Sequence, residues 1–351
     1  MRALVLGGTR FIGRRVVEEL LEAGHRVTLY TRGRVRDAFE GRVERLIGER
    51  RSAADLTDRL SGRDFDAAYD FLSYEASDAR LAIETLAGRV GHFIHISTCS
   101  VYWCTGDFPC PVAEGDFDRL SDFAERPGSI EYEYGYNKRK AEEALFAAHQ
   151  ERAFPVTTIR MPIIGGEDDP SLRYLSYVLR LSDGGPVALP DGGYAPFRHV
   201  YVADAARALA ALAGRTHSIG QAYNLAGADI LSVRGVVAAM ADLLGRRAET
   251  VDIPTPILRA MGLGTSFSPF SQQAAQVPAI FKARRDLGWE TTPHRVWLER
   301  TVEWSLRVAG SLPEPPPPVA HRSREIEVIE AYRRAVVRFD GAAGSSGEPR
   351  G

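Results

Sequence analysis

A glycine turn near the N-terminus constrains the fold more than any other feature of the sequence. The run LVLGGTRFIGRRVV, residues 4–17, reads as an apolar strand, a turn and an amphipathic helix. Gly7 permits a tight turn, Gly13 lets the helix pack close to the strand, and the helix N-terminus presents free N–H groups to an anion. The arrangement is typical of a dinucleotide site, and a plain strand–helix turn is the alternative interpretation.

The first half of the chain repeats this alternation. Short runs rich in Val, Ile and Leu are separated by amphipathic helices, and the predicted strands are residues 2–6, 26–31, 66–72, 92–97 and 155–161. This pattern favours a parallel sheet covered on both faces. The predicted fold class is therefore α/β, a doubly wound parallel (Rossmann) sheet with a smaller mixed C-terminal substrate lobe. Ligands of such sheets bind beyond the carboxyl ends of the strands.

After Gly165 the regular alternation of strands and helices gives way to turns with one helix, which suggests a second region. We expect residues 1–165 with 196–226 to form the dinucleotide-binding domain, and residues 166–195 with 227–312 to form the substrate-binding lobe. Residues 313–351 contain the stiff run PEPPPP, a charged helix and a tail of low complexity. We expect this last segment to be a spacer, a helix and a disordered end.

Composition excludes several classes of function. The 44 Lys and Arg residues balance 46 Asp and Glu residues, so no overall field favours nucleic acid or an acidic membrane. Three cysteines fit neither a disulfide framework nor a zinc pattern. No run approaches the roughly 20 apolar residues of a membrane span, and the N-terminal run is too short for a signal peptide. We expect a cytoplasmic protein with no metal, nucleic-acid or membrane partner.

The residues around the glycine turn bear on the choice of cofactor. Arg10 stands where such turns usually keep a middle glycine, and the second strand ends in Thr31 and Arg32 rather than in an acid. An acid would repel a 2′-phosphate, whereas hydroxyl and guanidinium groups attract one. The sequence therefore predicts NADP, with NAD as the alternative because exposed arginines are common. Glu49, after the next apolar run, is expected near the adenine.

Two overlapping Tyr-x-x-x-Lys pairs mark the predicted chemistry. They are Tyr134 with Lys138 and Tyr136 with Lys140, about thirty residues after the strand-end run HISTCSVY. A free phenol titrates near pH 10 and is a poor base at neutral pH. A neighbouring ammonium and a positively charged nicotinamide favour the phenolate, and a nearby hydroxyl would orient it. This combination predicts proton exchange with a substrate hydroxyl or carbonyl.

These motifs resemble those of extended short-chain dehydrogenases/reductases of the NAD-dependent epimerase/dehydratase family, over about residues 1–305. The helix motif of that family is matched at Tyr134, Gly135, Lys138 and Glu142. The resemblance assigns the catalytic roles to Tyr134 and Lys138, and its strand motif places the catalytic hydroxyl on Thr98. The runs GGTRFIG and RVTLYTRGR are similar to a branch that includes chloroplast stem-loop RNA-binding proteins and bacterial reductases or epimerases.

The resemblance also implies a set of cofactor-binding residues. The run RMPIIGG is similar to the segment that backs the nicotinamide in the family. The implied residues are Gly7, Thr9, Arg10, Phe11, Ile12, Gly13, Thr31, Arg32, Glu49, Leu72, Lys138, Pro162 and Ile163. The family also implies a homodimer formed through two helices of each subunit.

Departures from the family pattern narrow the expected substrate. Cys99 and Ser100 replace the Asp-Glu pair of sugar-nucleotide 4,6-dehydratases, so that dehydration is not expected. Trp103 replaces a glycine and predicts a more aromatic pocket mouth. Phe197, followed by Arg198, occupies the position of an arginine that grips diphosphate in many sugar-nucleotide members. This argues against a nucleotide-sugar substrate.

The predicted function is an NAD(P)-dependent oxidoreductase or epimerase acting on an alcohol or ketone of a sugar-like or secondary-metabolite substrate. Tyr, Lys and Thr would provide acid–base chemistry beside nicotinamide hydride transfer. The alternatives are an RNA-binding protein of the stem-loop-binding type and an NADP-sensing regulator without turnover. An RNA-binding surface would be a basic stripe with interleaved aromatic residues. The basic runs here are better explained by the cofactor site and by a helix surface.

Overall fold

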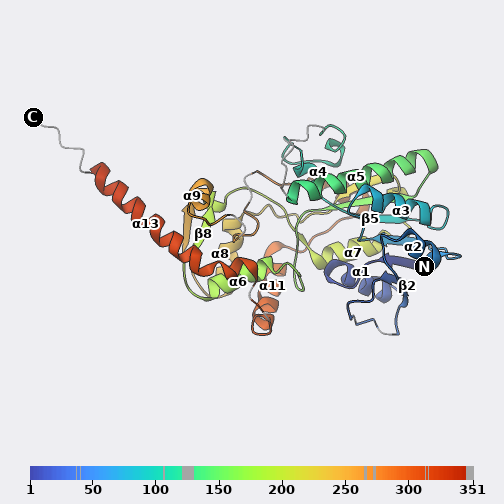
Figure 1. Ribbon diagram of the computed structural model, residues 1–351, viewed down its shortest axis with the longest axis horizontal. Coiled ribbons are helices and arrows are strands. Elements are labelled where there is room, and N and C mark those ends of the chain that lie inside the picture. Colours follow the sequence, from blue (N-terminus) through green and yellow to red (C-terminus); the bar gives the residue numbers. More distant parts are fainter. Residues whose placement is uncertain are drawn as a thin grey trace, which may run out of the picture. The chain divides into compact units, whose positions relative to one another are not determined.

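The computed structural model describes residues 1–36, 38–39, 41–105, 107–120, 130–264, 267–271, 274–312, 314 and 316–344 (Figure 1). The chain forms two compact units. The first contains Met1–Pro170, Arg198–Asp229 and Gln276–Pro293, and the second contains Ser171–Phe197, Ile230–Ala275 and His294–Gly351.

The first unit is built on a seven-stranded sheet whose order is β10-β6-β5-β4-β1-β2-β3. Every pair of neighbouring strands is parallel. The strands are β1 (Arg2–Leu6), β2 (Arg26–Thr31), β3 (Glu44–Ile47), β4 (Ala67–Asp70), β5 (Phe93–Thr98), β6 (Val156–Met161) and β10 (Gln221–Asn224). The chain winds outward in both directions from β1, so the predicted doubly wound α/β fold is confirmed.

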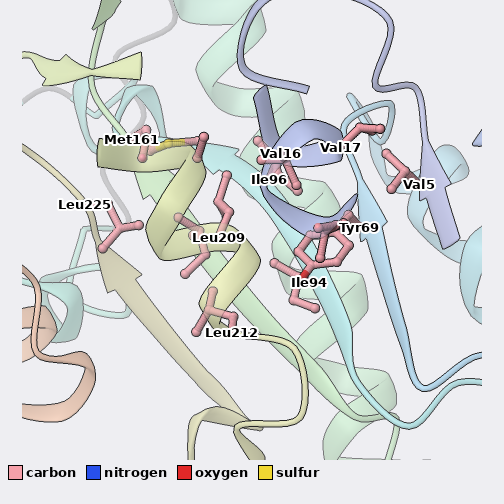
Figure 2. Close-up of a cluster of buried hydrophobic side chains, with 14 of the residues drawn as sticks. Val5, Val16, Val17, Tyr69, Ile94, Ile96, Met161, Leu209, Leu212 and Leu225 are labelled. Carbon is pink, nitrogen blue, oxygen red and sulfur yellow. The ribbon is translucent and has the colours of Figure 1, made fainter. Parts of the chain in front are cut away.

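Helices cover both faces of this sheet. One face packs against α1 (Phe11–Glu22) and α7 (Val202–Ala211), and Figure 2 shows part of that core. The other face packs against α2 (Ala53–Leu60), α3 (Ala76–Leu86) and α5 (Ile130–Arg152). Because both faces are covered, every residue of the central strands β4, β5 and β6 is buried, rather than every second one. The remaining short elements are α4 (Ser100–Trp103), β7 (Ile164–Gly165), β9 (Val200–Tyr201), α10 (Phe281–Leu287) and the 3₁₀ turns Glu114–Asp116 and Thr216–Ser218.

The second unit is mainly helical. Helix α6 packs against α8 and α11, and the short strands β8 and β11 pair in parallel. Its elements are α6 (Arg173–Ser182), β8 (Val187–Pro190), the 3₁₀ turn Asp191–Gly193, α8 (Val233–Leu243), β11 (Thr250–Ile253), α9 (Thr255–Ala260), α11 (His294–Ala309), α12 (Pro317–Ala320) and α13 (Arg322–Gly344). Among the described helices of the whole chain, none is both long and apolar enough to span a bilayer.

The boundaries of the units differ from the predicted domains by a few residues after β7, before β9 and after β10, and by whole segments in two places. Residues 276–293 belong to the first unit, where the N–H of Ala279 donates to the carbonyl of Val112 and the indole of Trp289 donates to Ala226. The described part of residues 313–344 belongs to the second unit instead of standing apart from it. Of the predicted disordered tail, residues 341–344 continue helix α13 and residues 345–351 lie outside the described part of the chain.

Candidate active site

The glycine turn joins β1 to α1 by a backbone that other residues rarely adopt. The φ angles of Gly7 and Gly8 are +103° and +85°. A Cβ atom on Gly8 would lie 2.7 Å from the side chain of Val5, and one on Gly13 would lie 2.8 Å from the Cα atom of Gly8. Helix α1 therefore starts directly against the turn. Gly8 is a residue of the site that the sequence did not single out.

The start of α1 keeps donors available for an anion. Its N-cap residue is Arg10, which makes no side-chain capping hydrogen bond, and the first helical turn contains no acid. The first N–H groups of a helix have no partner within the helix. The turn therefore fits the diphosphate of a dinucleotide, with the cradle formed by Gly7, Gly8 and the first residues of α1.

The structure places the residues implied for cofactor binding along one edge of the sheet, after the carboxyl ends of strands β1 to β6. A Cβ atom on Gly7 would lie 3.4 Å from the side chain of Leu72, which follows β4. Thr31 pairs with Ile47, so Glu49 follows the neighbouring strand end. Thr98 pairs with Met161, and Pro162 and Ile163 come next. Thr9, Phe11 and Ile12 lie in the turn and the first turn of α1.

Exposed basic side chains lie at the end of this edge where the adenosine of the cofactor is predicted to bind. Arg10 and Arg32 are exposed, and within the described part of the chain neither forms a salt bridge. The hydroxyl of Thr31 accepts the N–H of Gly33 at 3.2 Å. Glu49 is also exposed, and its backbone N–H donates to Asp55. Two guanidinium groups and one carboxylate are thus available here.

Thr98 and Tyr134 meet at the end of β5. Tyr134 lies in the first part of α5, and its side chain is 39% exposed. Burial of the ring and then the nearby Tyr74 raise the pKa of Tyr134 to about 12, while a hydrogen bond with Thr98 opposes this rise. The acidification that the sequence led us to expect from Lys138 is therefore not present in the protein alone.

Lys138 lies beneath the site rather than at its surface. It is 2% exposed, and its Nζ donates to the carbonyls of Ser73 and Ile96, both at 2.7 Å. The ammonium is 5.0 Å from the centre of the Tyr74 ring. Burial lowers the pKa of Lys138 to about 8, against the opposing influence of Asp70 and other carboxylates. Lys138 is therefore a buried cation whose pKa lies well below that of an ordinary lysine.

The second Tyr-x-x-x-Lys pair has different surroundings. Tyr136 stacks on Tyr132 with ring centres 6.0 Å apart. Lys140 lies over the Tyr136 ring and pairs with Glu143 at 2.7 Å, with more than a third of its side chain exposed. These contacts are those of a helix surface, whereas Tyr134 and Lys138 contact residues at the strand ends.

A buried ion pair supports the helix that carries Tyr134 and Lys138. Glu142 accepts the Nε–H of Arg160 of β6 on both carboxylate oxygens, at 3.2 and 3.0 Å, and an Nη2–H at 2.6 Å. It also accepts the hydroxyl of Ser97. Arg160 also donates to the hydroxyl of Tyr102 at 2.8 Å. The sequence signal for this pair is Arg160, a charged residue inside the run VTTIRM. Among the described residues, no group of three or more His, Cys, Asp or Glu side chains is arranged to hold a metal ion.

Together, the doubly wound sheet, the glycine turn and the Tyr-x-x-x-Lys helix beside a strand-end hydroxyl define the class of extended short-chain dehydrogenases/reductases. The chain belongs to the NAD dependent epimerase/dehydratase family, whose model matches residues 3–226. It is therefore an enzyme of the extended short-chain dehydrogenase/reductase type.

Two curated relatives are similar over most of the chain. One is the chloroplast stem-loop binding protein of 41 kDa b of Arabidopsis thaliana, 25% identical over 82% of this chain and 75% of that protein. Another is 2′-dehydrokanamycin reductase of Streptomyces kanamyceticus, 27% identical over 72% of this chain and 70% of that protein. Their names describe two of the functions considered from the sequence.

Solved structures show the same fold at low sequence identity. An epimerase of Methanothermobacter thermautotrophicus superimposes with a TM-score of 0.69, 19% identity and coverage of 88% of this chain and 93% of that one. UDP-glucose 4-epimerase of Thermotoga maritima, solved with UDP-glucose, gives a TM-score of 0.69, 18% identity and coverage of 88% and 100%.

Proposed function

We propose that this enzyme oxidises, reduces or epimerises an alcohol or ketone carbon of a sugar-like or secondary-metabolite substrate, using a nicotinamide cofactor. The observation that carries the proposal is that Tyr134 interacts with Thr98 at the end of β5, while the buried ammonium of Lys138 donates to the Ile96 carbonyl of the same strand. The glycine turn lies at the same edge of the sheet. Acid–base groups and a dinucleotide cradle at one edge are the components that hydride transfer at a hydroxyl-bearing carbon requires.

Each catalytic residue has a distinct role in this proposal. The Tyr134 hydroxyl gives a proton to the substrate oxygen in reduction and takes it in oxidation, and Thr98 orients that oxygen by a hydrogen bond. Lys138 supplies a buried positive charge that helps to hold the cofactor and that, together with an oxidised nicotinamide, would favour the Tyr134 phenolate. A nicotinamide held at this edge would accept or donate the hydride.

We propose NADP as the preferred cofactor, with NAD as the alternative. Arg10 and Arg32 are exposed without salt bridges among the described residues, and Thr31 adds a hydroxyl at the end of β2. A guanidinium binds a phosphate through charge-assisted hydrogen bonds. Glu49 is assigned to the adenine rather than to the ribose, so its carboxylate does not oppose the assignment.

The proposed substrate lacks a nucleoside diphosphate. Phe197, in the position where many sugar-nucleotide enzymes carry an arginine, is buried and packs near Phe270 with ring centres 6.2 Å apart. Cys99 and Ser100 follow Thr98 where an acid would be needed to expel water. An unphosphorylated keto-glycoside suits these residues, and the similarity to 2′-dehydrokanamycin reductase supports that substrate class.

Consumption of NADPH with a panel of keto-glycosides, and with UDP-glucose as the nucleotide-sugar comparison, tests the proposal. We expect Tyr134→Phe to bind NADPH normally but to lower turnover at least about a hundredfold, because a positioned acid–base group contributes about 10²–10⁴. Tyr136→Phe is the matched control and is expected to lose much less. Equal losses would contradict the assignment. Tight binding of an RNA stem-loop without any NADPH consumption would favour the RNA-binding alternative.

A further inference from the structure

A buried carboxylate holds the loop that receives the Lys138 ammonium. Asp70 ends β4 and is fully buried. Its Oδ1 accepts the backbone N–H groups of Leu72 at 2.8 Å and Ser73 at 3.1 Å, and its Oδ2 accepts the Ser73 hydroxyl at 2.6 Å. The carbonyl of the same Ser73 accepts the ammonium of Lys138. Ser73 is thus bound by Asp70 on one side and by Lys138 on the other.

Arg50 completes this cluster from the loop after β3. It is 4% exposed, and its Nη2 donates to the Asp70 carboxylate and the Ser73 hydroxyl, both at 3.0 Å, and to the carbonyl of Asp78 at 3.1 Å. Within the described part of the chain, its Nε and Nη1 have no hydrogen-bond partner. A guanidinium buried in this way depends strongly on its carboxylate, because removing one member of a buried pair leaves an uncompensated charge.

Asp70 also acts on Lys138 through its charge. Burial alone would raise the pKa of Asp70, but Arg50 and the Ser73 hydroxyl overcome this and hold that pKa below its ordinary value. The carboxylate is therefore ionised. Burial lowers the pKa of Lys138, and Asp70 is the largest of the influences that oppose this lowering. Without Asp70, the ammonium would lose its proton more readily.

The other groups that face Lys138 do not replace Asp70. Glu142 on its own helix and Asp78 on α3 act in the same direction with smaller effect. Burial and then Lys138 lower the pKa of His95, on β5, to about 3, so this imidazole is neutral at ordinary pH. Tyr74 and Tyr134 have raised pKa values and are also neutral.

We propose that Asp70 and Arg50 are positioning residues, which fix the Ser73 loop and keep the Lys138 ammonium charged and in place for the cofactor. The inference rests on the proposed role of Lys138 and extends it to two residues that do not themselves contact cofactor or substrate. It also gives a reason for a polar cluster at the buried ends of β3 and β4.

The test is the pH dependence of NAD⁺ binding to the full-length protein, because NAD⁺ lacks the titrating 2′-phosphate of NADP⁺. Binding that needs the ammonium should weaken above the pKa of Lys138, about pH 8 in the native protein. Asp70→Asn removes the carboxylate, so the pKa of Lys138 falls and the weakening should start about one pH unit lower. At a pH between the two midpoints, we expect affinity to fall several-fold relative to the native protein.

Matched variants separate this role from general loss of structure. Asp204→Asn also removes a buried carboxylate, which bonds Thr292 and is not among the charges acting on Lys138, and it should leave the profile unchanged. If Asp70→Asn does not fold, Asp70→Asn with Arg50→Met removes both charges and should shift the profile in the same direction.

Two different failures are distinguishable. Lys138→Met should bind NAD⁺ weakly at every pH, without a further loss of affinity at alkaline pH. Suppose that Lys138→Met behaves in this way, but that Asp70→Asn loses NAD⁺ affinity at the same pH as the native protein. The positioning role of Asp70 is then wrong, and the proposed function stands. If Lys138→Met keeps the native profile, Lys138 has no part in cofactor binding and the proposed function loses its cation.

Discussion

Arg10 occupies the position where a dinucleotide-binding turn usually has a glycine. Its replacement is therefore the most direct test of the proposed preference for NADP over NAD. Its guanidinium is exposed at the N-cap of α1, where no other side chain caps the helix. If it contacts the 2′-phosphate, Arg10→Gly should weaken NADP⁺ binding by about tenfold or more, since a hydrogen bond to a charged group contributes about 1.5–3 kcal/mol. NAD⁺ binding should change little.

Calorimetric titration of both cofactors measures this prediction. Thr31→Asp with Arg32→Ala should remove or invert the preference for NADP⁺, because it deletes a cation and adds like-charge repulsion. Equal weakening of both cofactors by Arg10→Gly would instead make Arg10 a contact to the shared diphosphate. A native preference for NAD⁺ would overturn the proposed cofactor.

Single residues were predictable from the sequence where a motif marks them. Thr98, Tyr134 and Lys138 come from short patterns with known spacing, and the structure brings them to one sheet edge. Arg50 and Asp70 have no such pattern, because β1 and β2 separate β3 from β4 in the sheet and the pairing depends on how the loop after β3 folds back to the end of β4. The raised pKa of Tyr134 was likewise not predictable, since it comes from burial and from Tyr74, which is distant in sequence.

Among the elements, α5 depends on its buried ion pair with β6. Glu142 and Arg160 are at most 2% exposed, and they join the helix that carries Tyr134 and Lys138 to the sheet. Glu142→Gln should lower the free energy of unfolding by about 3–5 kcal/mol, because it leaves the Arg160 charge uncompensated. Urea denaturation measures the effect. Glu18→Gln, which removes the partner of the partly exposed Arg14 on α1, should cost only about 0–1 kcal/mol. Similar costs for both variants would contradict the argument.

The long, strongly patterned elements were the predictable ones. The strands Arg2–Leu6 and Arg26–Thr31 are short, mostly apolar runs, and helix α1 shows clear apolar periodicity. Strand β3 and helix α2 were not singled out, because β3 has only four residues and buries one of them. Helix α2 has eight residues, and its clearest sign is the Ser52 hydroxyl that caps it by accepting the N–H of Asp55. Short elements of this kind depend on tertiary packing more than on local pattern.

At the scale of the whole molecule, both units are assembled from segments that are far apart in sequence. A sequence pattern shows where the order of strands and helices changes. It does not show which later segment packs into which of the two hydrophobic cores. This is why residues 276–293 were placed in the smaller lobe although they complete the first unit, and why α13 was expected to stand apart. In α13, Val328 and Ile329 are fully buried in the core of the second unit together with Ala188 and Phe267.

The last prediction concerns how α13 is held in the second unit. Glu325 is fully buried, forms an ion pair with Arg180 of α6, and accepts the backbone N–H of Ala188 at 2.9 Å. Arg322 donates to the Glu325 carboxylate at 2.8 Å and also pairs with Asp183 at 2.6 Å. One carboxylate therefore compensates two guanidinium groups in a region shielded from water. Such a carboxylate is costly to remove.

Glu325→Gln should lower the free energy of unfolding of the second unit by about 3–5 kcal/mol. The matched control is Glu327→Gln, whose carboxylate pairs with Arg324 at an exposed position and should contribute only about 0–1 kcal/mol. Denaturant unfolding followed by tryptophan fluorescence measures both, because Trp297 and Trp304 lie on α11 of that unit. Since the cofactor residues all belong to the first unit, NADP⁺ affinity should stay within about twofold of the native value. If Glu325→Gln unfolds like the control, α13 is a peripheral helix rather than a structural part of the second unit.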